Sequence, residues 1–419
     1  MTNEILRKIY RSLLVGAIII LAMLIYILFF HKPYYGKNRV TLNKNTLEQK
    51  SPSNKIGNKN FTEQKITSNT VRIQGENMYK TTVAITQVAY PSNFAHNRPN
   101  AVILVREDKI EDAILAGRIS HEPINAPILY IKKDYIPEET LKEIERLKPR
   151  GVFLDGNIKI ILIGDVDVGV LKKLNDQKLK YRHINGENTF SLSLNIDNYL
   201  AAIQGDHKDA VIIAPIEEPE YALPQLAWNA HAGDGFFFIE KDKIPMEVEK
   251  ALNNRHGNAY IYILAREGLI SKATEDQLSR YGHVQRIPMG EDAYSMAVGF
   301  ARYKDVGKNF SWWLGTRPRD FGWGISKPGH SFTFVNPKQW QIAVTSSILS
   351  HKGKHGPMLL VEENKIPDAV KNYLQTLKPS YNSSQEHLYN YGWIIGSEDS
   401  ISNFLQAKID ELLDTREYK

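Results

Sequence analysis

The chain has 419 residues, of which 42% are hydrophobic and 24% charged, a composition typical of globular proteins, and its length leaves room for two or three domains. It contains no cysteine, which excludes disulfide frameworks, cysteine nucleophiles and thiolate metal sites. The net charge of +6 is concentrated in residues 1–70, where eleven Lys and Arg face three Glu. Because the remainder is nearly neutral, a broad nucleic-acid-binding surface is not expected there.

An uncharged run, SLLVGAIIILAMLIYILFF, occupies residues 12–30. A helix of this length roughly spans the ~30 Å hydrocarbon core of a bilayer. The alternative is a cleaved signal peptide, but the run is longer than the usual apolar region, and the following HKPYYGKN offers no small-x-small cleavage site. The pattern therefore predicts an uncleaved, single-pass transmembrane anchor. Basic residues flank the run on both sides, and the short tail at residues 1–11 favours a cytoplasmic N-terminus with the body outside.

Residues 31–69 are rich in Asn, Lys, Ser and Thr and show almost no apolar periodicity. Such a segment cannot bury enough apolar surface to offset the entropy lost on ordering. We therefore expect a flexible basic linker, followed by a folded body that begins near Thr70.

Matched signals recur three times in the body, which indicates an internal repeat. Gly-Glu followed by Asn or Asp occurs at Gly75, Gly186 and Gly290, each before a helical pattern. Further on, an apolar run leads each time into Ile-Pro, in KDYIPEE, KDKIPME and ENKIPDA. The predicted domains are repeat 1 at residues 70–181, repeat 2 at 182–285 and repeat 3 at 286–419.

Ile-Pro marks a change from strand to helix in each repeat. Proline is favoured in the first turn of a helix, where its missing N–H costs nothing, and the acidic residues after it suit the positive end of the helix dipole. Strands that alternate with helices of ten to fifteen residues call for parallel sheets. The predicted fold class is α/β, with three tandem parallel-sheet units preceded by one transmembrane helix and a flexible tether.

The body resembles the cell-wall-binding repeat 2 family. The likeness rests on the opening glycine before an aromatic residue and a helix, then PILYIKKDYIPEETLKEIERLKP, then IILIGD, and it covers about residues 70–419. Modules of this family occur in threes in surface-layer and other cell-wall proteins of clostridia and bacilli. The resemblance implies a threefold pseudosymmetric arrangement and non-covalent retention on an anionic cell-wall polymer, without catalysis.

An insertion at residues 310–330, FSWWLGTRPRDFGWGISKPGH, has no counterpart in the other repeats. Aromatic faces stack on sugar rings and arginines pair with phosphate or carboxylate, so a glycan or protein site is one interpretation. Burial of the tryptophans to fix a long loop is the other. Together with the basic residues at the Ile-Pro turns, where helix N-termini favour anions, the insertion gives the candidate polymer-binding residues: Lys132, Lys133, Lys241, Lys243, Trp312, Trp313, Arg317, Arg319 and Trp323.

Other groups of residues give weaker evidence of a metal or catalytic site. Asp165 and Asp167 at a strand end could hold a divalent cation, but a helix cap with a solvated neighbour is the commoner role of such a pair. His351 and His355 lie four residues apart in a glycine-rich loop, where that spacing means little. No serine-hydrolase elbow, P-loop or zinc-protease motif is present. No metal or cofactor is predicted.

The sequence predicts a membrane-tethered, extracytoplasmic protein of a Gram-positive-type cell envelope. Its expected partner is an anionic polysaccharide or a teichoic-acid-like polymer. Two alternatives remain open: a scaffold or accessory subunit for an envelope protein partner, and an enzyme of unknown type. Nucleic acid is not an expected partner.

Overall fold

The structure, a computed structural model, divides the chain into two parts, Met1–Asn60 and Phe61–Lys419. The three repeats of the second part are called units one, two and three. The structure describes Leu21 and residues 66–288, 290–305, 309–311, 315–317, 320–379 and 389–414, with the backbone alone at 309–311 and 315–317. The predicted tail, anchor and linker at residues 1–69 thus lie outside the described residues, apart from Leu21 and residues 66–69. Within the described ranges, no helix combines the length and apolarity needed to cross a membrane.

Unit one is built on a parallel sheet whose strands lie in the order β3-β2-β4-β5. The inner strands β2 and β4 and the edge strand β3 are mostly aliphatic and buried along their whole length, as expected for a parallel sheet covered by helices. The elements are α2 (Met78–Ala89), β2 (Val102–Arg106), α3 (Ile110–Gly117), β3 (Ile128–Ile131), α4 (Glu138–Leu147), β4 (Ile160–Ile163), α5 (Val168–Asp176) and β5 (Tyr181–Ile184).

Unit two repeats this arrangement, with the strand order β7-β6-β8-β9. Its elements are α6 (Thr189–Gln204), β6 (Ala210–Pro215), α7 (Leu223–Ala232), β7 (Gly235–Ile239), α8 (Met246–Asn253), β8 (Ala259–Ile263), α9 (Lys272–Leu278) and β9 (Gly282–Arg286).

Unit three contributes three strands of its own sheet, and the fourth comes from the start of the body. The order is β1-β14-β12-β13, so that β1, which precedes unit one, is the edge strand of the last sheet. A two-stranded hairpin of β10 and β11 lies in the predicted insertion. The elements are β1 (Thr70–Ile73), α10 (Ala293–Arg302), β10 (Asn309–Ser311), β11 (Gly315–Arg317), β12 (Ser331–Val335), α11 (Trp340–Ser346), α12 (Ile348–His351), β13 (Met358–Leu360), α13 (Asp368–Thr376), β14 (Tyr391–Ile395) and α14 (Asn403–Leu413).

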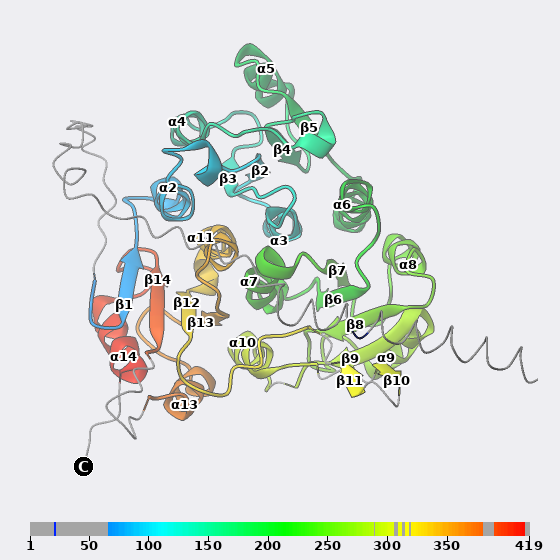
Figure 1. The fold of residues 1–419 in the computed structure, drawn as a ribbon, viewed down its shortest axis with the longest axis vertical. Helices are drawn as coiled ribbons and strands as arrows, with labels where there is room; N and C mark the ends of the chain where they lie inside the picture. The colour runs from blue at the N-terminus through cyan, green and yellow to red at the C-terminus, as the bar shows by residue number, and fades with distance from the viewer. Residues whose placement is uncertain are drawn as a thin grey trace, which may run out of the picture. The chain divides into compact units, whose positions relative to one another are not determined.

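The three units pack in a cyclic pattern around three central helices, α3, α7 and α11, one from each unit (Figure 1). The opening helix of each unit also packs on the central helix of the unit before it: α6 on α3, α10 on α7, and α2 on α11. This pattern has threefold pseudosymmetry. The predicted α/β class with three parallel-sheet units is confirmed, and the structure shows four strands in each of these sheets.

The Gly-Glu-Asn/Asp motif shapes the start of each opening helix. A Cβ on Gly75 would lie 2.4 Å from the carbonyl carbon of Lys80, and one on Gly186 would lie 2.3 Å from the backbone nitrogen of Leu192. Only glycine therefore lets the incoming chain lie so close to the first turn. The Asn or Asp that follows is the N-cap; the Asn188 side chain, for example, accepts a hydrogen bond of 2.8 Å from the Ser191 N–H.

The Ile-Pro turns lead from strand to helix, as predicted, with a small shift. Pro137, Pro245 and Pro367 are N-caps, and each helix begins one residue later than the predicted first-turn position. The proline ring fixes φ near −60°, while ψ stays extended, which turns the chain from the strand into the helix.

Candidate functional site

The lysines predicted at the first Ile-Pro turn follow β3 in unit one. The Lys132 ammonium pairs with the Glu107 carboxylate. The Lys133 Nζ lies 3.9 Å from a carboxylate oxygen of Asp165 and 3.9 Å from one of Asp167. Both cations therefore already face carboxylates of their own unit.

The corresponding lysines of unit two follow β7. The Lys243 Nζ lies 3.5 Å from Glu240 Oε2, and the backbone N–H of Lys241 donates to Glu217 Oε1 at 3.3 Å. Both side chains are exposed. The structure thus places the four predicted lysines in two separate pairs, at the carboxyl ends of strands in different units.

The two aspartates weighed as a cation site have cations beside them. In addition to Lys133, Arg106 Nη1 lies 3.8 Å from Asp165 Oδ2. Among the described residues, no group of three or more His, Cys, Asp or Glu is arranged to hold a metal ion.

Residues 312–314, 318 and 319 of the predicted aromatic insertion lie outside the described residues. This applies to Trp312, Trp313 and Arg319, and for Arg317, on β11, only the backbone is described. Trp323 is described and half-buried. Its ring lies 5.4 Å from that of Trp228, measured between centroids, and 5.9 Å from that of His231. Trp323 thus packs on α7, between units two and three.

A basic groove, which the sequence did not indicate, crosses unit one beside the C-terminal end of α4. It has a volume of about 680 Å³ and includes one carboxylate, that of Glu145. Its cations come from α4 and from the loops that precede β2 and β4, at the amino ends of the strands and so at the opposite edge of the sheet from Lys132. These cations are Arg98, Lys142, Lys148, Arg150 and Lys159.

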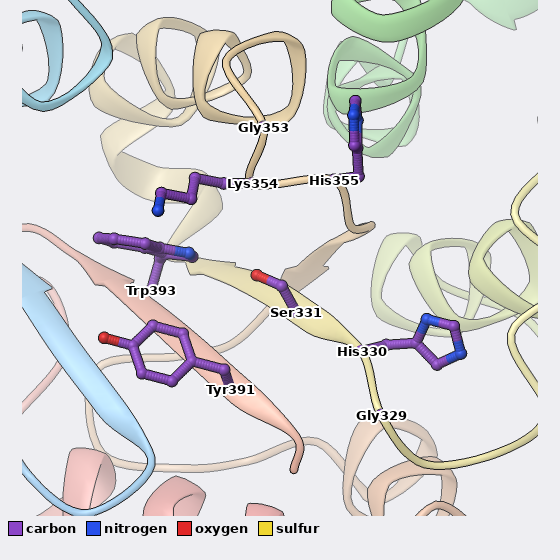
Figure 2. A pocket seen from close by; sticks show the side chains of 8 residues that line it. All are labelled: Gly329, His330, Ser331, Gly353, Lys354, His355, Tyr391 and Trp393. Atoms are coloured by element: carbon purple, nitrogen blue, oxygen red, sulfur yellow. The ribbon is translucent and has the colours of Figure 1, made fainter. Parts of the chain in front are cut away.

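A second cavity, of about 380 Å³, lies in unit three, where strands β12 and β14 begin (Figure 2). Three segments line it: the residues that lead into β12, the loop after α12, and the first residues of β14. We call it the aromatic cavity. Its lining contains no carboxylate and consists of Gly329, His330, Ser331, Gly353, Lys354, His355, Tyr391 and Trp393.

Trp393 forms the inner wall of the aromatic cavity and is 8% exposed. Its indole N–H and the Ser331 hydroxyl are both buried, and neither has a hydrogen-bond partner within the described part of the chain. The exposed Lys354 lies with its Nζ 5.4 Å from the indole ring centroid, a cation–π contact. The Tyr391 ring packs edge-on against the same indole at 5.4 Å.

Histidines from all three units meet where the central helices end. His121 of unit one and His351 of unit three have ring centroids 5.6 Å apart, and His231 of unit two lies 4.6 Å from His355. Burial lowers the pKa of His351 to about 4, and the nearby positive charges of Lys352 and His121 contribute to the same shift. Burial, together with the other histidines, also lowers the pKa of His231.

The sequence offered only a weak signal for the aromatic cavity. The third strand of unit three reads YGWIIG, whereas unit one has KIILIG at this place. The local sign was the pair of aromatic residues, Tyr391 and Trp393, where unit one has lysine and isoleucine. The other lining residues come from distant segments whose meeting no spacing rule predicts.

Comparisons with known proteins show a relative and two similar structures. The amidase enhancer of Bacillus subtilis (strain 168) is 23% identical over 338 residues, which cover 80% of this chain and 39% of the enhancer. The solved structure of Cwp6 from Clostridium difficile superposes with a TM-score of 0.65 at 16% identity, covering 85% of this chain and 51% of that one. The solved structure of Cwp8 from the same organism superposes with a TM-score of 0.63 at 21% identity, covering 83% of this chain and 52% of that one.

These likenesses establish the fold. The chain spans about half the length of the two solved structures and less of the enhancer. No protein-family model matches the chain.

Proposed function

We propose that this chain is a non-catalytic cell-envelope protein whose body binds an anionic wall polymer non-covalently. Its structural neighbours are Cwp6 and Cwp8, and its curated relative is an amidase enhancer, which favours the envelope as its place of action. The observation that carries the proposal is the basic groove of unit one, whose lining has five cations and one carboxylate. One of the five, Lys142, pairs with Glu138 on α4.

The groove suits a repeating polyanion better than a single small ion. Lys148, Arg150 and Lys159 are exposed, so each contact with a phosphate or carboxylate contributes only ~0.2–1 kcal/mol. Several such contacts along one chain raise the overall affinity through multivalency. Binding should therefore weaken steeply as salt screens the charges.

The membrane attachment is part of the same proposal. The apolar run at residues 12–30 would hold the N-terminus in the membrane, and the basic linker at 31–69 would let the body reach the wall. The body then faces outward in a Gram-positive-type envelope.

A pull-down on purified cell wall tests polymer binding. The full-length chain, kept in mild detergent, should sediment with the wall at low salt and remain in the supernatant at high salt. Lys148→Gln/Arg150→Gln/Lys159→Gln should weaken binding severalfold, whereas a variant that removes three exposed lysines on other helices, Lys172→Gln/Lys250→Gln/Lys371→Gln, should bind normally. Arg317→Ala/Arg319→Ala and Trp313→Ala test the insertion in the same assay. A folded chain that never sediments, or that binds identically in all variants and salts, would refute polymer binding.

An accessory role toward a wall-degrading enzyme is the second candidate. It is favoured by the amidase enhancer, whose aligned region covers 80% of this chain. The test is the rate at which a purified wall amidase releases soluble fragments from cell wall, with and without this protein. An accessory subunit raises that rate; an unchanged rate over a range of protein concentrations rejects the role.

A further inference from the structure

We propose that the aromatic cavity of unit three binds a sugar ring that carries a carboxylate or a phosphate. The cavity belongs to a different unit from the basic groove, so the inference does not depend on polymer binding there. Its volume of about 380 Å³ lies within the range of small-molecule sites.

The lining is rich in hydrogen-bond donors and has no acidic side chain. The buried Trp393 N–H and the Ser331 hydroxyl have no partner among the described residues, although buried polar groups are nearly always hydrogen-bonded. In the view of Figure 2, the nitrogen-bearing end of the indole is turned toward Ser331. Ring and hydroxyl oxygens of a sugar would supply the missing acceptor for the N–H and a partner for the hydroxyl.

Lys354 supplies the preference for a negative charge. It is exposed, and it lies over the Trp393 ring, with no ion pair to any described carboxylate. The other titratable side chains of the lining are His330, His355 and Tyr391. An anionic substituent on the ligand would therefore meet a cation at the mouth of the cavity without competing against a carboxylate of the protein.

The three sheets can be compared at the position of Trp393. Thr333 lies between Met358 and Trp393, as Ile212 lies between Phe236 and Tyr262 in unit two. In unit one, Ile103 lies between Ile128 and Ile161, so Ile161 is the residue that corresponds to Trp393.

Unit two shows what this position can hold. The Phe321 ring lies flat on Tyr262, with centroids 3.5 Å apart and 4° between the planes, and Phe321 is 1% exposed. One of the chain's own rings therefore packs on the residue of unit two that corresponds to Trp393. This comparison favours a ring-shaped ligand over a small inorganic anion.

Saturation-transfer NMR on the full-length chain tests the inference, with three matched probes: glucuronic acid, glucose 1-phosphate and uncharged glucose. We expect saturation of the ring protons of both acidic sugars and at least fivefold weaker binding of glucose. The relative strength of the two acidic probes identifies carboxylate or phosphate as the preferred group.

Three variants locate the site. Lys354→Gln should reduce the affinity for the acidic sugars to that for glucose, while Lys371→Gln, an exposed lysine on α13, should change nothing. Ser331→Ala and Trp393→Phe each remove one donor and should weaken all three probes by about threefold or more. If Trp393→Phe fails to fold, Ser331→Ala still tests the contribution of a cavity donor to binding.

Three results would overturn the inference: no saturation transfer with any probe, glucose bound as tightly as the acidic sugars, or binding unchanged in all three cavity variants. The first result would mean that water alone satisfies the indole N–H. The groove variant Lys148→Gln/Arg150→Gln/Lys159→Gln should keep its sugar signal. Loss of wall binding and loss of sugar binding are thus separable.

Discussion

Arg118 of unit one and Asp197 of unit two form an ion pair of 2.6 Å that is wholly buried between the units. Asp197 also accepts two hydrogen bonds from Arg255, at 2.9 and 3.1 Å. Burial alone would raise the pKa of Asp197, but the two arginines hold it well below its ordinary value. The carboxylate therefore stays charged and joins α3, α6 and the loop after α8.

Asp197→Asn should destabilise the body strongly. The substitution leaves two buried guanidinium groups without a counter-charge, which typically costs about 3–5 kcal/mol. Glu138→Gln, which removes an exposed partner of Lys142 on α4, should leave stability nearly unchanged. Urea denaturation of both variants measures the difference. Equal midpoints would show that the buried pair contributes no more than a surface one.

The contribution of His351, at the junction of the units, to the free energy of unfolding should fall between about pH 6.5 and pH 4. Asp112, whose pKa burial raises to about 6, contributes with the opposite sign below that pH. The folded-state pKa of His351 is about 4, below its ordinary 6.5, so in this range the unfolded chain binds the proton and the folded chain does not. Stability is thus fully present above pH 6.5 and decreases as the pH falls, by up to about 3 kcal/mol from this group.

The nearby charged groups leave the sign of this effect unchanged. Lys352, His121 and His231 oppose protonation of His351, and the Glu122 carboxylate, 3.9 Å from its Nε2, is half-exposed. Between pH 6.5 and pH 4 the thermal midpoint of His351→Gln should fall less than that of the wild type, whereas His256→Gln, at an exposed position after α8, should follow the wild type. A slope that persists in His351→Gln would assign the effect to other groups.

The glycine of the repeat motif should be irreplaceable for steric reasons. In Gly186→Ala the new Cβ would meet the Leu192 backbone, which has to shift, at a cost of about 3 kcal/mol. In Gly205→Ala, at the end of the same helix, nothing lies within 4 Å of the new Cβ, and only the left-handed backbone is strained, at a cost of about 1 kcal/mol. Thermal unfolding of the two variants compares them, and a larger loss for Gly205→Ala would contradict the steric explanation.

Arg72 should be required for β1 to stay paired. Its wholly buried guanidinium donates to the backbone carbonyl groups of Gly396 and Ser397, at 2.7 and 3.1 Å, and to Gln406. Burial lowers the pKa of Arg72, so these acceptors stabilise a charge that solvent does not. Arg72→Met should cost on the order of 3 kcal/mol.

Hydrogen exchange can show where that loss acts. The Gly396 N–H donates to the Ile73 carbonyl on β1, and the Gly392 N–H donates to the carbonyl of Asn69, just before β1. The exchange of both N–H groups should accelerate in Arg72→Met. Arg182→Met, on the corresponding strand β5, removes a half-exposed side chain and should leave the exchange rates unaltered. Unchanged protection of Gly392 in Arg72→Met would show that β1 is held by its backbone pairing alone.

Local patterns were sufficient to predict the repeated strands and helices. The aliphatic strands and the Ile-Pro turns are short-range features, and proline and capping geometry act within one helical turn. The partner of β1 could not be predicted in this way, because TVRI leads directly into unit one and carries no sign of β14 at the far end of the chain. The candidate sites were harder for the same reason: the sequence shows Lys132, but not that Glu107 lies beside it.

Attachment of β1 to the last sheet determines how the body would bear tension. If residues 12–30 anchor the chain, a pull through the linker reaches Thr67 before Asn69. The Thr67 hydroxyl and the Asn69 N–H both donate to Asp410 Oδ1 on α14, at 2.5 and 2.7 Å. From there the force passes along β1 into its backbone hydrogen bonds with β14. Unit three, the last in sequence, would thus be the first part of the body to be loaded, and rupture at that sheet edge would free the linker while leaving the four strands of unit one paired.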